Sequence, residues 1–234
     1  MKYLLTDGGG VVKVLNALVL SVALSLMFSL PANANLIING SFEDPVIPNH
    51  HYGLFFDGIP GWTPTNLDLG IEIQTLWTAY AGNQYVEPDT WRNTGFFQFV
   101  DTIPGQEYEF SFAYSARPGG YEWEPIEHPG PPSESNVVEF YFDGALIDSV
   151  TESRGFSNET LWSVHRYSLI ATGTSSEIRF MGAGTEDGLG VGGFIDDVRM
   201  VPVPEPSTMM LLGSGLVGLV GYGRGRMRRK HGNN

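Results

Sequence analysis

The stretch that decides the fold is Glu107-Tyr108-Glu109-Phe110-Ser111-Phe112-Ala113-Tyr114. Its four aromatic side chains alternate with acidic or small residues, so an extended chain would carry the aromatic rings on one face and the other side chains on the opposite face. This period of two, together with the high β-propensity of Phe and Tyr, predicts a strand that is buried on one side only.

Segments of the same kind recur between Asn35 and Val203, where no apolar period of 3.6 residues is sustained. Asp143-Gly144 is a two-residue turn between two of these runs, and Pro-Gly pairs at 60–61, 104–105 and 118–119 mark further turns. Many short strands joined by turns predict an all-β domain, an antiparallel β-sandwich of the jelly-roll type. The remaining strands are predicted at residues 71–77, 84–87, 95–100, 137–142, 145–150, 163–170, 176–181 and 193–200.

Composition and charge exclude several classes of function. The 234-residue chain has no cysteine, which excludes a disulfide framework, a thiol nucleophile and a zinc–thiolate site. The formal net charge is -13, and residues 35–203 hold 24 Asp and Glu against 6 Arg and no Lys. A domain with this negative charge repels the phosphate backbone of nucleic acids. We therefore expect no binding to nucleic acid. The many carboxylates of the domain could supply ligands to calcium.

Both ends of the chain are predicted to be targeting segments. The apolar run Val11–Leu30 and the A-x-A site that ends at Ala34 predict a secretory signal peptide over 1–34, with an uncleaved membrane anchor as the alternative. At the other end, residues 204–234 contain Pro204-Glu205-Pro206, an apolar segment at 208–222 and a basic cluster at 224–230. This order predicts a C-terminal transmembrane helix with its basic end in the cytoplasm.

The three-part tail resembles the PEP-CTERM sorting signal of exopolysaccharide-producing bacteria. The resemblance rests on Pro204, Glu205 and Pro206 together with the apolar and basic segments that follow. It implies that an exosortase, a membrane protease, recognises the tail. The mature protein would then be secreted or kept at the cell envelope. An ordinary tail anchor is the alternative.

The body resembles the galactose-binding-like jelly rolls, which include many carbohydrate-binding modules. The matching motifs are Asn35–Glu43 at the start, Ile59-Pro60-Gly61-Trp62 after it, and Phe194–Val198 at the end. The resemblance implies glycan binding and a structural calcium ion. Carried over residue by residue, the calcium ligands would be Glu43 and Asp196, helped by Asp197 or Asp44. In the alternative interpretation these carboxylates face solvent or accept backbone hydrogen bonds.

A glycan surface needs aromatic faces and a few planar hydrogen-bonding groups. Trp91, Tyr121 and Trp123 lie in polar, loop-like stretches, and Arg117 is near them in the sequence, so these four are the predicted ligand-binding residues. Ordinary packing is the alternative for each aromatic residue. Trp62 and Trp162 stand beside turns and are predicted to be core residues.

The sequence gives little support for a catalytic function. The pairs Glu122/Glu124 and Glu87/Asp89 could act as acid and base in glycoside hydrolysis, but such pairs arise by chance in so acidic a body. The sequence contains no G-x-S-x-G, P-loop or H-E-x-x-H motif. We therefore expect a non-enzymatic, exported carbohydrate-binding protein of the cell envelope or the exopolysaccharide matrix. The other hypotheses are a structural surface protein that mediates protein contacts without binding sugar, and a glycoside hydrolase.

Overall fold

The computed structural model describes residues 34–120, 132–153, 157–185, 191–204 and 215. Asn35–Val203 forms one compact unit. The predicted signal helix and C-terminal transmembrane helix fall outside the described residues. In the part of the chain that is described, no helix is long and apolar enough to cross a membrane.

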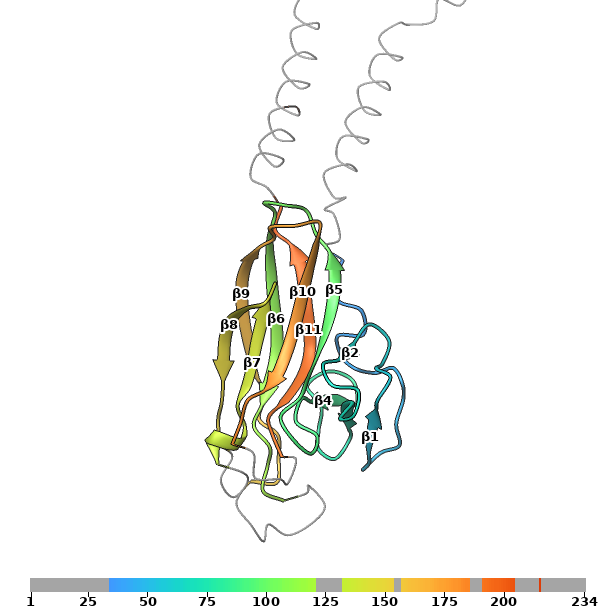
Figure 1. Cartoon of the computed structure of the whole chain (residues 1–234). Coiled ribbons are helices and arrows are strands. Elements are labelled where there is room, and N and C mark those ends of the chain that lie inside the picture. Colours follow the sequence, from blue (N-terminus) through green and yellow to red (C-terminus); the bar gives the residue numbers. More distant parts are fainter. Residues whose placement is uncertain (1–33, 121–131, 154–156, 186–190, 205–214, 216–234) are drawn as a thin grey trace, which may run out of the picture. The chain divides into compact units, whose positions relative to one another are not determined.

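Two antiparallel sheets form the body, which confirms the predicted β-sandwich (Figure 1). A short 3-10 helix, η1 (Ser133–Ser135), precedes β7. The six-stranded sheet has the order β1 (Tyr52–Phe55), β3 (Ile71–Gln74), β4 (Tyr85–Glu87), β11 (Phe194–Pro202), β6 (Glu107–Ser115), β9 (Ser163–Ile170). The five-stranded sheet has the order β2 (Thr63–Pro64), β5 (Gly95–Asp101), β10 (Ser175–Gly182), β7 (Val138–Phe142), β8 (Ala145–Val150).

Most of the predicted strands are found where the period of two placed them. β8 and β9 have the predicted bounds, whereas β3 ends at Gln74 rather than at residue 77. The sequence analysis missed β1 and β2. β1 is a four-residue edge strand that contains Gly53, and β2 is only two residues long and includes Pro64. Such short segments carry no readable alternation, and their extended form depends on pairing with β3 and β5.

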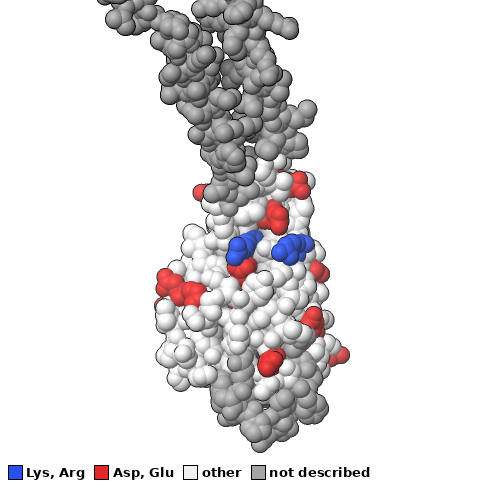
Figure 2. Space-filling view, turned by 180° about the vertical axis from the view of Figure 1, so that it is seen from behind, with Lys and Arg blue, Asp and Glu red and all other residues white. Residues whose placement is uncertain are grey.

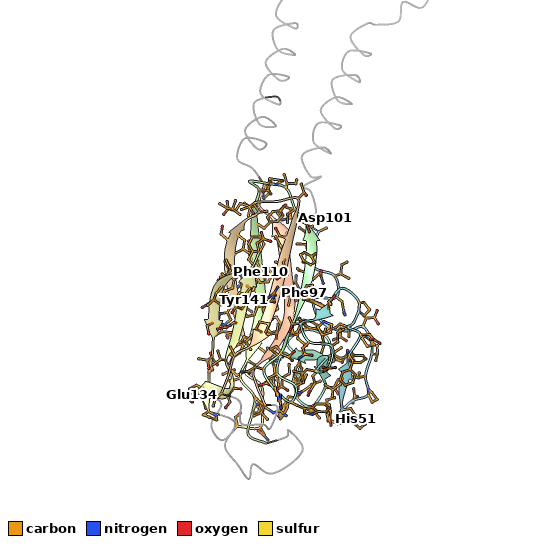
Figure 3. All side chains as sticks on the ribbon, in the orientation of Figure 1. His51, Phe97, Asp101, Phe110, Glu134 and Tyr141 are labelled. Atoms are coloured by element: carbon orange, nitrogen blue, oxygen red, sulfur yellow. The ribbon has the colours of Figure 1, made fainter. Side chains whose placement is uncertain are left out.

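The core lies between the two sheets and is largely aromatic. Phe110 on β6 stacks on Phe140 of β7, with ring centroids 4.3 Å apart and planes 7° apart (Figure 3 labels Phe110). The aromatic face predicted for β6 is buried along its whole length, since Tyr108, Phe112 and Tyr114 are also buried. Exposed acidic side chains are spread over the surface, as one side of the molecule shows (Figure 2).

The N-terminal segment of the body runs beside the last strand. The Leu36 amide donates to the Met200 carbonyl over 2.9 Å, and the Val198 amide donates to the Gly40 carbonyl over 2.8 Å. β11 has an irregularity between Asp196 and Arg199, where its register with β6 shifts. This arrangement places segments from the two ends of the body next to each other.

Candidate functional site

A second aromatic cluster lies on the outer face of the six-stranded sheet. Because side chains alternate along a strand, Val86 and Ile195 point into the main core, while their neighbours Tyr85 and Phe194 point outward. The Tyr85 and Phe194 rings are 4.7 Å apart at their centroids. Trp77 and Trp162 extend the cluster at 5.5 Å from Phe194 and 5.7 Å from Tyr85, respectively.

Buried polar side chains share this sheet face with the aromatic cluster. Glu72 on β3 lies opposite Glu87 on β4, and the Gln74 amide donates to a carboxyl oxygen of each of them, over 2.7 Å in the case of Glu72. Arg117, just after β6, donates to both Glu87 oxygens over 2.9 and 2.7 Å. Its guanidinium carbon also lies 5.3 Å from the centre of the Trp77 ring. We call Glu72, Gln74, Glu87 and Arg117 the polar cluster.

Burial raises the pKa values of the two carboxyl groups in the polar cluster. It raises the pKa of Glu72 from 4.5 to about 7, although Arg117 and the amide of Gln74 act in the opposite direction. Burial also raises the pKa of Glu87 well above its usual range, against the opposing effect of Arg117. Two carboxyl groups directly opposite each other repel when both are charged. The guanidinium of Arg117 and the side-chain amide of Gln74 offset this repulsion by hydrogen bonding to the carboxyl groups.

A shallow hollow gives solvent access beside the aromatic cluster. It has a volume of about 420 Å³ and is lined by Thr78, Asn158, Glu159, Thr160 and Trp162. Tyr80 is 46% exposed, and its ring centroid lies 6.4 Å from that of Trp162. The Trp162 ring nitrogen donates to the Thr78 carbonyl over 3.0 Å, which fixes the ring at the edge of the hollow.

Of the two predicted ligand-binding residues that the structure describes, only Arg117 lies on this face. Arg117 belongs to the polar cluster, whereas Trp91 is 58% exposed in the connection between β4 and β5. Tyr121 and Trp123 fall outside the described residues, as do Glu122 and Glu124. Trp62 is buried in the main core as predicted, whereas Trp162 is only partly buried and packs against the second cluster.

Sequence reasoning missed most members of this site. Of the pair Glu87/Asp89, Glu87 is the ion-pair partner of Arg117, and Asp89 is buried nearby. The run Ile71-Glu72-Ile73-Gln74 held the available signal, because its polar side chains would share one face of a strand whose apolar face is in the core. Nothing in the sequence shows that this polar face meets Glu87 and Arg117.

The predicted calcium ligands Glu43 and Asp196 contact the same loop. One Glu43 oxygen accepts the amides of Asn83 and Gln84 over 2.8 and 2.9 Å, and Asp196 accepts the amide of Ala81 over 2.8 Å. Asp196 is fully buried, which raises the pKa of its carboxyl from 3.8 to about 7.

Asp197 does not join them, because its carboxylate pairs with Arg199 at 2.9 Å. Among the described residues, no set of three or more His, Cys, Asp or Glu side chains is arranged to hold a metal ion. The all-oxygen character of Glu43 and Asp196 suits calcium, but backbone oxygens would have to complete its shell.

Comparisons with known proteins identify the tail. Residues 202–229 match the PEP-CTERM protein-sorting motif, which confirms the predicted sorting segment. Pro204 is exposed, whereas Glu205 and Pro206 fall outside the described residues. This motif indicates an exported protein of the cell envelope.

The chain also has more distant similarities to curated proteins. Part of the chain is 26% identical over 163 residues to the multifunctional-autoprocessing repeats-in-toxin of Vibrio cholerae serotype O1, and 27% identical over 168 residues to that of Vibrio vulnificus. The matches cover 67% of this chain but only 3% and 2% of those proteins.

Solved structures with a similar fold include carbohydrate-binding modules. TmCBM61, solved in complex with beta-1,4-galactotriose, is 16% identical with a TM-score of 0.42, over 73% of this chain and 99% of its own. A CBM4 structure is 18% identical with a TM-score of 0.38, over 71% and 99%. The chain thus consists of an antiparallel β-sandwich followed by a PEP-CTERM protein-sorting motif.

Proposed function

We propose that the sandwich is a non-catalytic carbohydrate-binding domain and that it holds a glycan on the outer face of the six-stranded sheet. One observation carries this proposal: the partly buried Trp162 lines a hollow open to solvent, and the buried polar cluster and the buried rings of Trp77, Tyr85 and Phe194 lie on the same face of the sheet. A face buried only for stability gains nothing from charged groups, because their desolvation is costly. A sugar, in contrast, needs aromatic faces for its C–H surfaces and oriented polar groups for its hydroxyls.

The members of the site would divide these tasks. Trp162 lines the hollow and Tyr80 packs against Trp162, so a sugar ring could reach an aromatic face from solvent there. Glu72 and Gln74 are buried behind the rings and hydrogen-bonded to each other, and Arg117 holds Glu87 in place, so the polar cluster would support the face from beneath. Both Glu87 oxygens already accept hydrogen bonds, one of them also from the Gly192 amide over 2.5 Å. A carboxylate held in this way supports binding rather than nucleophilic attack.

Glycan binding is tested with residues 35–203 on a polysaccharide and oligosaccharide panel. We expect Trp162→Ala to weaken binding strongly and Trp91→Ala to leave it unchanged; Trp91 is the matched control because it is an exposed tryptophan on another loop. Loss of binding in Trp91→Ala alone would place the site where the sequence first suggested it. No binding by the wild-type domain would favour the structural surface protein that mediates protein contacts.

A second proposal is a structural calcium ion held by Glu43, Asp196 and backbone oxygens near the loop at 80–84. Its support is that two carboxylates distant in sequence meet one loop and that Asp196 is buried. When bound, the cation would supply positive charge to these carboxylates and stabilise the folded state by linkage.

The melting temperature of the domain in calcium and in excess chelator tests this second proposal. We expect chelation to lower it in the wild type and in the control Asp68→Asn, an exposed aspartate that is not among the predicted ligands, but not in Asp196→Asn. Equal melting temperatures in calcium and chelator would rule the ion out.

The tail supports a proposal about processing. An exosortase would recognise Pro204–Pro206 while the apolar segment at 208–222 spans the membrane, and it would release or retain the sandwich outside the cell. We expect deletion of residues 208–230 to send the protein into the medium, as measured by immunoblotting of cell and medium fractions. Continued cell association of the deleted chain would contradict a role of the tail in anchoring.

A further inference from the structure

One end of the sandwich is built from two turns that hold each other. The turn at 102–106 joins β5 to β6, and the turn at 171–174 joins β9 to β10. The Gly105 amide donates to the Ala171 carbonyl over 2.8 Å, and the Ala171 amide donates to the Gln106 carbonyl over 3.1 Å. This end of the molecule is therefore a firmly bonded surface; Figure 3 labels Asp101 beside it.

The chain leaves the sandwich at this same end. Val203, the last residue of the body, donates its amide to the Glu107 carbonyl over 2.9 Å. Its carbonyl accepts a hydrogen bond from the Gln106 side chain over 2.6 Å. The sorting segment therefore begins directly beside the two turns.

A large apolar side chain is exposed to solvent within the first turn and directly before the second. Ile103 is 65% exposed and Ile170, at the end of β9, is 62% exposed. The Ile103 amide donates to the Tyr108 hydroxyl over 2.9 Å, so its backbone is fixed. Single exposed apolar residues are ordinary. Here two isoleucines occur at the hydrogen-bonded turns, one within a turn and one at the end of β9, next to the exit of the chain.

The connection to the apolar tail is too short to keep this end far from a membrane. Only residues 204–207 separate Val203 from the apolar segment that begins at Thr208. A fully extended chain covers at most about 3.6 Å per residue, so Thr208 lies within about 18 Å of Val203. If the segment at 208–222 spans the bilayer, the two turns lie at or near its headgroup region.

We propose that this end is a membrane-facing surface of the precursor, on which Ile103 and Ile170 enter the headgroup region of the leaflet nearest the sandwich. The contact would fix the orientation of the body at the membrane surface. This inference rests on the membrane-spanning tail proposed above. It concerns the precursor, not the glycan site.

The charged residues at this end of the sandwich indicate which lipids it could contact. Asp101 and Glu107 are exposed beside the turns, and residues 101–107 and 170–175 contain no Lys or Arg. Carboxylates are repelled by an anionic leaflet. The surface therefore fits zwitterionic lipids, with the apolar side chains supplying the attraction.

The absence of cysteine permits a direct test with the full chain. Single Ile103→Cys and Ile170→Cys chains are labelled with an environment-sensitive fluorophore and reconstituted into phosphatidylcholine–phosphatidylethanolamine vesicles that contain a shallow, quencher-bearing lipid. Leu161→Cys is the matched control, because Leu161 is 64% exposed and lies beyond the opposite end of β9. A Thr172→Cys chain keeps both isoleucines and labels the same turn.

We expect blue-shifted, quenched emission at 103, 170 and 172, and water-like, unquenched emission at 161. Added phosphatidylglycerol should weaken the quenching at the first three positions. Water-like emission at all four positions, in chains that stay with the vesicles after an alkaline wash, would overturn the membrane-facing surface while leaving the anchor intact. Chains that wash off the vesicles would overturn both proposals.

Discussion

Replacing Glu72 by glutamine should stabilise the sandwich at pH 8 and change its stability little at pH 4.5. Burial raises the folded-state pKa of Glu72 from 4.5 to about 7, so the folded state holds its proton more tightly than the unfolded state does. The stability supplied by the protonated group is complete below pH 4.5 and is lost as the pH rises to about 7. At about 1.4 kcal/mol for each pKa unit, the loss is about 3 kcal/mol. Glutamine is neutral at every pH and keeps an oxygen that can accept from Gln74.

The assay is denaturant unfolding of residues 35–203 at both pH values, for the wild type and the Glu72→Gln variant. Glu109→Gln is the control, because its side chain is 58% exposed and should show little change at either pH. The expected signature is a stability difference that grows with pH. A variant that is less stable than the wild type at pH 8 would refute the reasoning. It would show that the attraction between ionised Glu72 and Arg117 outweighs the cost of burial.

Three further outcomes follow from the packing. Trp62→Ala should cost about 3–5 kcal/mol in unfolding free energy, because this 2% exposed ring lies in the main core; a loss below 1 kcal/mol would mean that the site collapses without a cavity. Gly40→Ala should destabilise the body far more than Gly144→Ala does. A Cβ at position 40 would lie 2.1 Å from the Val198 carbonyl oxygen, whereas a Cβ at position 144 would meet nothing within 4 Å and only the φ of +79° there is unfavourable. Similar unfolding midpoints for the two variants would contradict the close approach at Gly40. Deleting residues 208–230 should leave the melting temperature of the body unchanged, because the core consists of residues 35–203; a clear drop would show that the tail contributes to the fold.

The strands were predictable because a half-buried sheet imposes its period on the chain. In β6 the alternation is complete, and each of its four aromatic rings is buried. The turn at Asp143-Gly144 was also readable, since both residues adopt positive φ, 49° and 79°, which Asp and Gly tolerate better than most residues. These are local requirements, and they act on adjacent residues.

The polar cluster could not be predicted in this way. Glu72 and Glu87 meet only because β3 pairs with β4 in one register, and a shift by one residue would turn Glu72 into the core. Arg117 reaches Glu87 from the end of β6, across β11 in the sheet order. Trp91, Tyr121 and Trp123 were predicted as ligand-binding residues because they lie in polar, loop-like stretches of sequence. That criterion does not show which aromatic rings lie on the same surface.

The sequence by itself determined the sandwich class, most strand positions and the sorting tail, because each is written in adjacent residues as a period, a turn or an ordered motif. Tertiary structure alone decided that Glu43 and Asp196 meet one loop and that a guanidinium and two carboxyl groups lie under an aromatic face. The physical reason is that strand order and register join residues far apart in the chain. Burial at those junctions then sets the pKa of each carboxyl group.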